Sequence, residues 1–218
     1  MSNNKPHIKV RVANSADCQY AQAICDQIEE SAKARGTGIA KRSVAYIENQ
    51  INSQKSIIAI DVKKDEVAGF CYIESWGHQK YAANSGLIVF PNYRKLGLAR
   101  RIKEEAFKLS RKRFPLAKLF GLTTSLAVMK INSEIGYHPV TYSELTTDEE
   151  FWKGCQSCVN YEILQSKERK NCICTAMLFD PTAKKKKKKW TIQVKESVYE
   201  RWKSLKLFLF TKNKVENK

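Results

Sequence analysis

The sequence lacks long hydrophobic runs, and no stretch approaches the roughly 20 consecutive apolar residues that a membrane-spanning helix needs. Its first residues, Met-Ser-Asn-Asn-Lys-Pro, contain no apolar core of the kind that signal peptides carry. We therefore expect no transmembrane segment and a cytoplasmic location.

Acidic residues are scarce relative to basic ones. The chain has 39 Lys and Arg against 22 Asp and Glu, a formal charge of +17. Residues 183–218 alone carry 13 basic against 3 acidic residues, which is +10, and +7 remains for the rest of the chain. With 218 residues and 43% hydrophobic content, the sequence excludes disorder throughout and predicts one well-packed domain with an appendage. A body charge of +7 suits a ligand with several phosphates.

The nucleotide-binding patterns Gly-x-Gly-x-x-Gly and Gly-x-x-x-x-Gly-Lys-Ser/Thr are also absent.

The most informative stretch is residues 85–102. The apolar run Leu87 to Phe90 predicts a buried strand that ends at Pro91, because proline cannot donate to a strand ladder. A helix is expected from Leu98 onward. Its apolar residues recur every three or four positions, and the residues expected to face water are Arg100, Arg101, Lys103 and Glu104.

The entrance of that helix favours an anion. Gly97 and Ala99 leave backbone N–H groups accessible, and the helix dipole adds to the charges of Arg94, Lys95, Arg100 and Arg101. A pyrophosphate fits this combination.

The other elements follow from periodicity and turn residues. A helix after Asn14 and Asp17 is expected to end near Gly36. The expected strands are 8–12, 57–62, 67–74, 116–124 and 137–145, and the remaining expected helices are 43–53 and 126–135.

Arg94-x-x-Gly97-x-Ala99, after Val89-x-Pro91, resembles the acyl-CoA signature of GNAT-type N-acyltransferases, which reads Gln/Arg-x-x-Gly-x-Gly/Ala. One strand, two helices and three strands before this loop is also the GNAT order. The resemblance implies an α/β (α+β) GNAT fold over residues 8–150, a central mixed β-sheet flanked by helices, and acetyl-CoA or succinyl-CoA as acyl donor. It further implies that strand and loop backbone hold the pantetheine arm and the pyrophosphate, through Leu87, Ile88, Val89, Arg94, Lys95, Leu96, Gly97, Leu98, Ala99 and Arg100.

A second local likeness concerns the acceptor. Thr123-Thr124, a short helix, and then Gly136-Tyr137-x-Pro139-Val140 resemble the acyltransferase domain of N-acetylglutamate synthases. This resemblance implies transfer of the acyl group to the amine of a small molecule, with glutamate as the leading candidate, as in arginine biosynthesis. Ser125 stands where that family has an arginine. The alternatives are another amine, including a protein lysine or N-terminus, and a non-catalytic acyl-CoA-binding or nucleic-acid-associated protein.

In GNAT folds the connection between the first two helices lies over the acceptor site. The resemblance therefore makes Arg35, Lys41 and Arg42 candidate ligands of substrate carboxylates; the alternative is a solvated basic loop. Glu74 or His78 is the expected base for the amine proton.

Many GNAT enzymes protonate the leaving thiolate with a tyrosine on the fourth helix, but residues 129–134 contain none. Tyr137 is the nearest phenol, and a core role is the alternative for it.

Seven cysteines, an odd number, argue against a disulfide framework. Four of them form the pattern Cys155-x2-Cys158-x13-Cys172-x-Cys174, within an extension that we expect at residues 151–182. Three interpretations fit it: a structural zinc site, reduced thiols packed near the core, and a redox role.

The tail at 183–218 begins with a lysine run, 184–189, that is too charged to pack. Residues 190–210 then mix aromatic and basic side chains. We expect a solvated extension, with adhesion to nucleic acid or a membrane as the alternative. A homodimer is compatible with the sequence.

Overall fold

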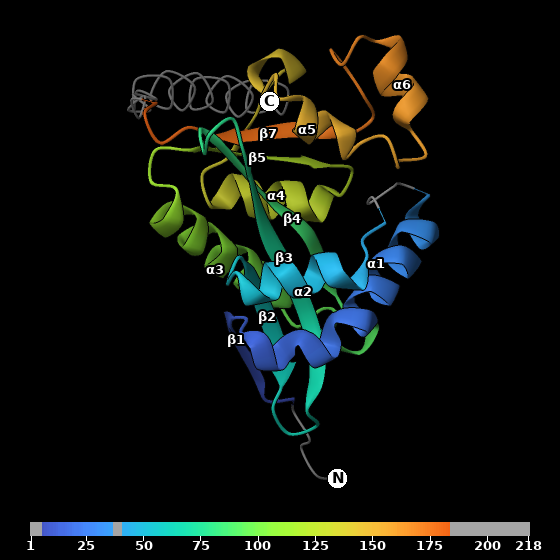
Figure 1. Ribbon diagram of the computed structural model, residues 1–218, viewed down its shortest axis with the longest axis vertical. Coiled ribbons are helices and arrows are strands. Elements are labelled where there is room, and N and C mark those ends of the chain that lie inside the picture. Colours follow the sequence, from blue (N-terminus) through green and yellow to red (C-terminus); the bar gives the residue numbers. More distant parts are fainter. Residues whose placement is uncertain (1–5, 37–40, 184–218) are drawn as a thin grey trace, which may run out of the picture. The chain divides into compact units, whose positions relative to one another are not determined.

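A twisted seven-stranded sheet organises the computed structural model, which describes residues 6–36 and 41–183 (Figure 1). The strand order is β1-β2-β3-β4-β5-β7-β6, with β4 and β5 parallel and every other pair antiparallel. The strands are β1 (Ile8–Val12), β2 (Ser56–Asp61), β3 (Glu66–Trp76), β4 (Tyr81–Val89), β5 (Lys118–Thr123), β6 (His138–Pro139) and β7 (Thr175–Phe179). The expected mixed sheet is confirmed.

Helices cover both faces of the sheet. The α-helices are α1 (Ala21–Arg35), α2 (Val44–Asn52), α3 (Leu98–Arg113), α4 (Leu126–Glu134), α5 (Glu149–Lys153) and α6 (Tyr161–Ser166). Three 3-10 helices, η1 (Ser15–Tyr20), η2 (Pro91–Tyr93) and η3 (Tyr142–Glu144), complete the described elements. Residues 37–40 of the first inter-helix loop and the tail from residue 184 lie outside the described residues.

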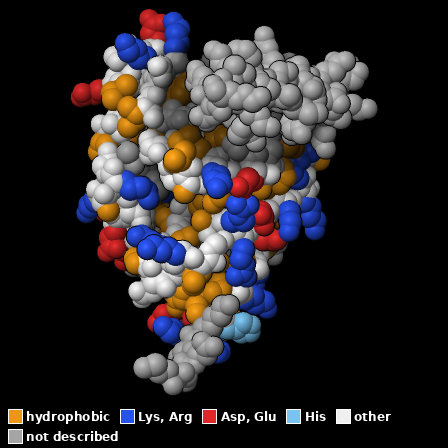
Figure 2. All heavy atoms as spheres, turned by 180° about the vertical axis from the view of Figure 1, so that it is seen from behind, with side chains coloured by type: hydrophobic (Ala, Val, Ile, Leu, Met, Phe, Trp, Pro, Cys, Tyr) orange, Lys and Arg blue, Asp and Glu red, His pale blue; other side chains and the backbone are white. Residues whose placement is uncertain are grey.

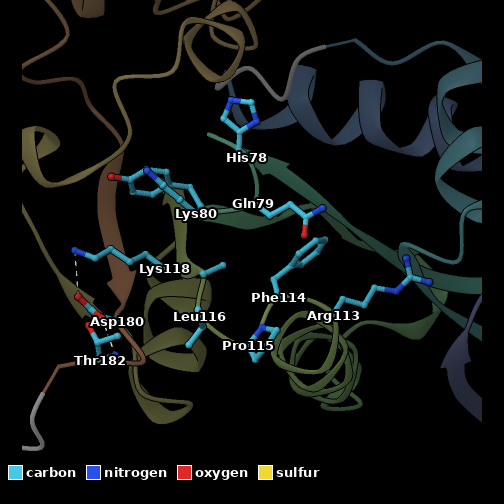
Figure 3. Close-up of a pocket in the computed structure, with 12 residues that line it drawn as sticks. His78, Gln79, Lys80, Arg113, Phe114, Pro115, Leu116, Lys118, Asp180 and Thr182 are labelled. Atoms are coloured by element: carbon cyan, nitrogen blue, oxygen red, sulfur yellow. Dashed lines mark hydrogen bonds and ion pairs between the residues drawn. The ribbon is translucent and has the colours of Figure 1, made fainter.

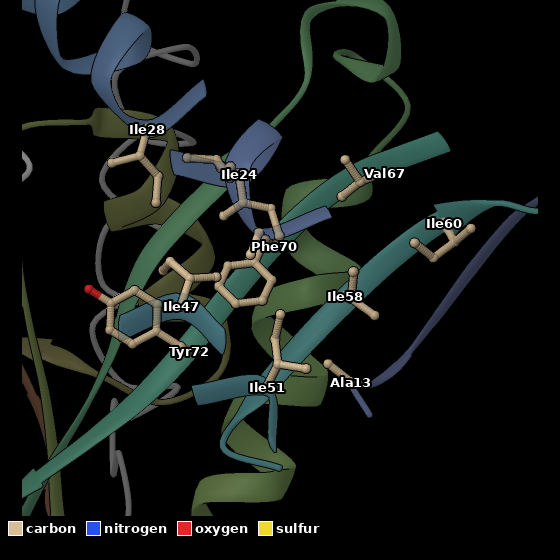
Figure 4. Packing of buried hydrophobic residues seen from close by; sticks show 12 residues of the cluster. Ala13, Ile24, Ile28, Ile47, Ile51, Ile58, Ile60, Val67, Phe70 and Tyr72 are labelled. Atoms are coloured by element: carbon tan, nitrogen blue, oxygen red, sulfur yellow. The ribbon is translucent and has the colours of Figure 1, made fainter. Parts of the chain in front are cut away.

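The alternation of side chains along β2 and β3 separates the two layers. Ile58 and Phe70 point to α1 and α2, where Ile24 and Ile47 meet them (Figure 4). Ile57 and the other members of the opposite face pack against α3. Beyond β4 the same division continues, with η3, α5 and α6 on the α1 side and α4 on the α3 side.

Two expectations about the C-terminal part change. The segment 137–145 is a strand only at His138–Pro139 and then forms η3. Pro139 has no N–H to donate, and Thr141 with Glu144 forms a capping box that favours a helical turn over a strand. The segment 151–182, expected as an extension, supplies β7, which lies between β5 and β6. A boundary at residue 150 therefore cuts through one sheet.

A buried ion pair links β1 to η1. The two terminal guanidinium nitrogens of Arg11, Nη1 and Nη2, donate to the Asp17 carboxylate at 2.6 and 2.7 Å, and the Asn14 N–H adds a third hydrogen bond at 2.8 Å. The Asp17 side chain is 4% exposed. Burial on its own would raise the pKa of this carboxyl, but the hydrogen bonds and the Arg11 charge outweigh it, so the pKa lies below its ordinary value.

We expect Asp17→Asn to lower the free energy of unfolding by about 1–3 kcal/mol at pH 7, since Arg11 is left beside a neutral amide but remains partly exposed. Because the folded-state pKa is lowered, this stabilisation is fully present above the ordinary carboxyl pKa. It disappears as the pH falls through the folded-state value. Urea unfolding of both chains from pH 7 to pH 2 measures the difference.

Asp26→Asn, at an exposed position of α1, is the matched control and is expected to leave stability nearly unchanged. A constant gap between Asp17→Asn and the parent chain at every pH would contradict the assignment.

Candidate active site

The parallel strands β4 and β5 separate after a short pairing. Only Tyr81–Ala83 of β4 pairs with Lys118–Phe120 of β5, although β4 runs on to Val89 and β5 to Thr123. A cavity of about 310 Å³ opens where they diverge, and both strands line it. Backbone N–H and C=O groups of two strand edges therefore face a space into which an extended ligand can fit.

A bulge in β4 lies at this opening. Phe70 pairs with Ile88 and Tyr72 with Ser85, so two residues of β4 oppose one of β3. Gly86, at φ +63°, permits the bulge; a Cβ there would lie 2.3 Å from the Tyr72 ring. The extra residue also shifts the alternation of side chains, so that residues of β4 after the bulge point to the opposite face from the one expected without it. The Ile88 side chain therefore lies on the α1 side, and Leu87 and Val89 lie on the α3 side.

The loop after β4 forms a helix entrance with exposed backbone. Gly97 is the N-cap of α3 at φ +70°, and no side chain caps the helix. The first N–H groups of α3 are therefore available to an anion. Arg94 donates to the Val89 carbonyl at 3.2 Å, which fixes the loop against the end of β4.

The remaining residues of the predicted pyrophosphate loop differ in burial and in their contacts. Leu98 is buried in the core under α3, whereas Leu96 is exposed. Arg100 forms an ion pair with Glu134 of α4. Figure 2 shows many Lys and Arg side chains on the face seen from behind; they make this surface attractive to phosphate groups.

On the α1 side of the cavity, Glu74 is held in a hydrogen-bonded cluster. The Tyr46 hydroxyl donates to Glu74 Oε1 at 2.5 Å, and Arg42 Nε donates to the Tyr72 hydroxyl at 2.7 Å. Arg42 Nη2 lies 4.0 Å from Glu74 Oε1. Burial, followed by the Glu74 charge, raises the pKa of both Tyr46 and Tyr72, so both phenols stay protonated.

Of the three cations expected to bind the acceptor, the structure brings two to this cavity. Arg35 and Arg42 line it. Partial desolvation and then the nearby charge of Arg94 lower the pKa of Arg35, although the residue remains exposed. Lys41 instead forms an ion pair with Glu29 of α1 at 3.3 Å and does not line the cavity.

Residues 42–128 match the family model described as "Acetyltransferase (GNAT) family". The chain carries a GNAT acetyltransferase domain. The matched span runs from Arg42 through the β4 bulge and the α3 entrance into α4. The α/β fold expected from the resemblance is confirmed.

Solved structures agree with the GNAT fold. The chain is similar to N-acetylglutamate synthase from Neisseria gonorrhoeae in complex with coenzyme A and N-acetyl-glutamate, with 17% identity and a TM-score of 0.56; 82% of this chain and 36% of that chain are covered. It thus spans about a third of that synthase's length. A comparison with curated proteins gave no sequence match.

Two further structures are covered almost completely. The Rv2747 protein of Mycobacterium tuberculosis, in complex with CoA, has 17% identity and a TM-score of 0.55, over 79% of this chain and 98% of that one. The putative acetyltransferase yncA of Salmonella typhimurium, with acetyl-CoA, has 14% identity and a TM-score of 0.53, over 82% and 96%. None of the described helices is long and apolar enough to cross a membrane.

His78 lies away from the Glu74 side of the GNAT domain. It is exposed in the turn between β3 and β4 and lines a second cavity of about 490 Å³, with Arg113, Phe114 and Asp180 (Figure 3). A base must lie within hydrogen-bond reach of the amine, directly or through one water. The structure therefore keeps Glu74 and not His78 beside the split between β4 and β5.

Tyr137 occupies the core between α3, α4 and the sheet. It is 3% exposed, packs against Phe107 and Phe179, and donates a hydrogen bond to Asn84 Oδ1 at 3.4 Å. Burial raises the pKa of its phenol. This placement fits the core alternative rather than a proton donor in the cavity.

The structure does not support the zinc interpretation of the four late cysteines, because the described residues contain no group of three or more His, Cys, Asp or Glu side chains placed to hold a metal ion. All four cysteines are free and partly buried. Burial raises the pKa of Cys155 to about 11 and of Cys174 to about 12, so both side chains are protonated thiols near pH 7 in the metal-free protein. Cys155, Cys158 and Cys174 line the cavity instead.

Two groups of residues in or beside the cavity were not predicted from the sequence. Tyr46 and Tyr72 hold Arg42 and Glu74, and their positions in α2 and β3 carry no local signal of that role. Lys103 was expected to face water but is only 2% exposed. Its signal was present in the sequence, because Lys103, Ala106 and Ser110 repeat at spacings of three and four, and all three are buried.

Proposed function

We propose that the protein transfers an acyl group from acetyl-CoA, or a similar acyl-CoA such as succinyl-CoA, to the amine of a small amino acid, with glutamate as the leading acceptor. The observation that carries the proposal is the split between β4 and β5, which opens into a cavity with Glu74 and Arg42 on one side. Glutamate as acceptor would make this an early step of arginine biosynthesis.

The donor is expected to enter from the α3 side. Its pyrophosphate would bind the N–H groups at the start of α3 beside Gly97, assisted by Arg94. The pantetheine arm would then lie along the edge of β4 that β5 leaves unpaired. Its amide groups would form hydrogen bonds with the β4 backbone, as an additional strand would. The thioester carbonyl would then lie near the bulge at Gly86, where backbone N–H groups would stabilise the tetrahedral oxyanion.

The acceptor is expected on the α1 side. Glu74, oriented by Tyr46, would take a proton from the amine directly or through one water. The planar guanidinium of Arg42 faces the same space and would bind a carboxylate of the acceptor. Attack on the thioester then forms the amide bond and breaks the C–S bond, and CoA leaves as a thiol after protonation.

The experiment is to follow CoA-thiol release by the purified full chain with acetyl-CoA and succinyl-CoA across a panel of amines. Glutamate, glutamine, aspartate, alanine and a lysine peptide form the panel, and a reaction without amine is the blank. We expect the fastest release with glutamate. Calorimetry with CoA measures donor binding independently.

Release with the peptide alone would favour a protein substrate. Binding of CoA without release for any amine would overturn the proposed transfer and favour a non-catalytic acyl-CoA-binding protein.

A further inference from the structure

Lys103 of α3 is a buried lysine without an anionic partner among the described residues. Its residue is 2% exposed, and none of the ion pairs or side-chain hydrogen bonds between described residues involves its ammonium group. Burial lowers the pKa of Lys103, because the ammonium loses its hydration and no nearby negative charge outweighs that loss. An uncompensated ammonium in a protein interior is costly by several kcal/mol, so such a residue calls for an explanation.

The neighbours of Lys103 supply no negative charge. Its Nζ lies 5.5 Å from the centroid of the Tyr137 ring, and Cys71 of β3 is the other titratable group close to it. Burial raises the pKa of Cys71 to about 11 and raises that of Tyr137, so both groups are neutral near pH 7. The cation–π contact offsets only part of the desolvation of the ammonium.

The side chain does not reach bulk water at the edge of the molecule, as lysines on an apolar surface commonly do. It lines the cavity at the split between β4 and β5 instead. Glu74 and Arg42 line the same cavity from the α1 side of the sheet, whereas Lys103 comes from α3 on the other side. The cavity therefore passes through the sheet at the split.

A second unsatisfied group lies on the same wall. Asn132 of α4 is 1% exposed and lines the cavity, and its Oδ1 has no hydrogen-bond partner in the part of the chain that the structure describes. Its Nδ2 makes only a weak contact with the Met177 sulfur at 3.7 Å. The two ends of an amide are nearly equal in shape, so a half-turn would exchange them and present the NH₂ donor to the cavity.

Lys103 also lies at the level of the bulge. Its neighbour Cys71 is the β3 residue opposite Gly86 and Leu87, between the pairs Phe70–Ile88 and Tyr72–Ser85. If the thioester carbonyl binds at this bulge, the acceptor amine approaches from the Glu74 side. An acyl chain that extends away from the amine then leads toward Lys103 and Asn132.

We propose that Lys103 and Asn132 bind the distal carboxylate of a dicarboxylic acyl group, so that the preferred donor is a succinyl-type acyl-CoA rather than acetyl-CoA. The inference rests on the proposed acyl-CoA function and names the donor class for that same site. A succinyl carboxylate would face the Lys103 ammonium for as long as the donor is bound, whereas the leaving thiolate carries its charge only briefly. A charge-assisted pair shielded from water also discriminates strongly against an uncharged chain.

The test compares binding of succinyl-CoA, butyryl-CoA and free CoA to the full chain by calorimetry. Butyryl-CoA has the same four-carbon chain without the carboxylate. We expect succinyl-CoA to bind at least about 10-fold more tightly than butyryl-CoA, the effect of one charge-assisted hydrogen bond. In Lys103→Met, a neutral side chain of similar length, the preference is expected to disappear or reverse while CoA binds as before.

Thermal unfolding of Lys103→Met is the folding control, and its midpoint is expected to stay equal or rise because a buried charge is removed. Lys103→Gln provides a second neutral variant should Lys103→Met fail to fold. Lys108→Met, exposed on the same helix, is the matched control and should keep the preference.

The outcomes separate the two proposals. Absence of CoA binding would contradict the proposed function itself. Binding of CoA with equal affinities for succinyl-CoA and butyryl-CoA would overturn only the inference about Lys103. An equal fall of kcat with both donors in Lys103→Met, at unchanged relative affinities, would also overturn it, because a role at the leaving thiolate predicts that pattern.

Discussion

Glu74→Gln is expected to lower kcat for acyl transfer by about 10²- to 10³-fold, the usual contribution of a positioned general base. Glutamine has the same shape, and its amide oxygen can still accept the hydrogen bond from Tyr46, so the geometry of the cluster is retained. The ability to take the amine proton is lost, together with the negative charge that lies 4.0 Å from Arg42 Nη2. CoA affinity should stay unchanged, because the proposed donor contacts lie on β4 and at the start of α3.

The measurement is steady-state CoA-thiol release at saturating donor, with calorimetric CoA binding as the check on the fold of the site. Glu162→Gln, exposed on α6 and outside the cavity, is the matched control and should behave like the parent chain. Tyr46→Phe keeps the ring but removes the hydrogen bond to Glu74, so a smaller loss, roughly 10-fold or less, is expected. Unchanged kcat in Glu74→Gln would eliminate this residue as the base.

Arg42→Met is expected to raise the KM for glutamate by roughly 10- to 100-fold, the equivalent of one lost charge-assisted hydrogen bond or bidentate pair to a carboxylate. The KM for the acyl-CoA should change little. Arg42→Lys keeps the charge but not the planar pair of donors, and an intermediate value is expected for it. Varying glutamate at fixed donor measures each constant.

Lys41→Met is the matched control for this series. Lys41 precedes Arg42 and carries the same charge, but it pairs with Glu29 outside the cavity, so its removal should leave the KM for glutamate unchanged. Arg42 also donates to Tyr72 and lies 5.3 Å from the centroid of the Tyr46 ring, so thermal unfolding must accompany the kinetics. Equal effects of the Lys41 and Arg42 substitutions on KM would contradict a specific carboxylate contact.

Glu74→Gln and Arg42→Met test different functions of one hydrogen-bonded cluster. Arg42 precedes α2 and Glu74 lies in β3, 32 positions later in the sequence. Tyr46 of α2 and Tyr72 of β3 hold them together. A loss of kcat in one variant and a rise of KM in the other would separate the chemical step from acceptor binding. A parallel loss of both constants in both variants would indicate that the cluster acts mainly as a structural support.

Local sequence determined the order of helices and strands up to α4 and the anion-binding entrance of α3. These features depend on short-range causes: apolar periodicity, the N–H that Pro91 lacks, and the glycine at Gly97 that adopts φ +70°. The acyl-CoA signature is also a local feature, because its fixed residues lie between Arg94 and Ala99. Such patterns can be recognised without knowledge of what packs against them.

Only the tertiary structure decided which polar residues share the cavity. His78 and Glu74 are four positions apart on one hairpin, yet they line different cavities because β3 carries Glu74 to the split and leaves His78 beyond its end. Lys103 is buried because α3 presents two adjacent rows to the sheet rather than one. β7 enters the sheet between β5 and β6, a pairing with strands more than 35 positions earlier. Contacts between distant segments set these outcomes, and periodicity within one segment does not record them.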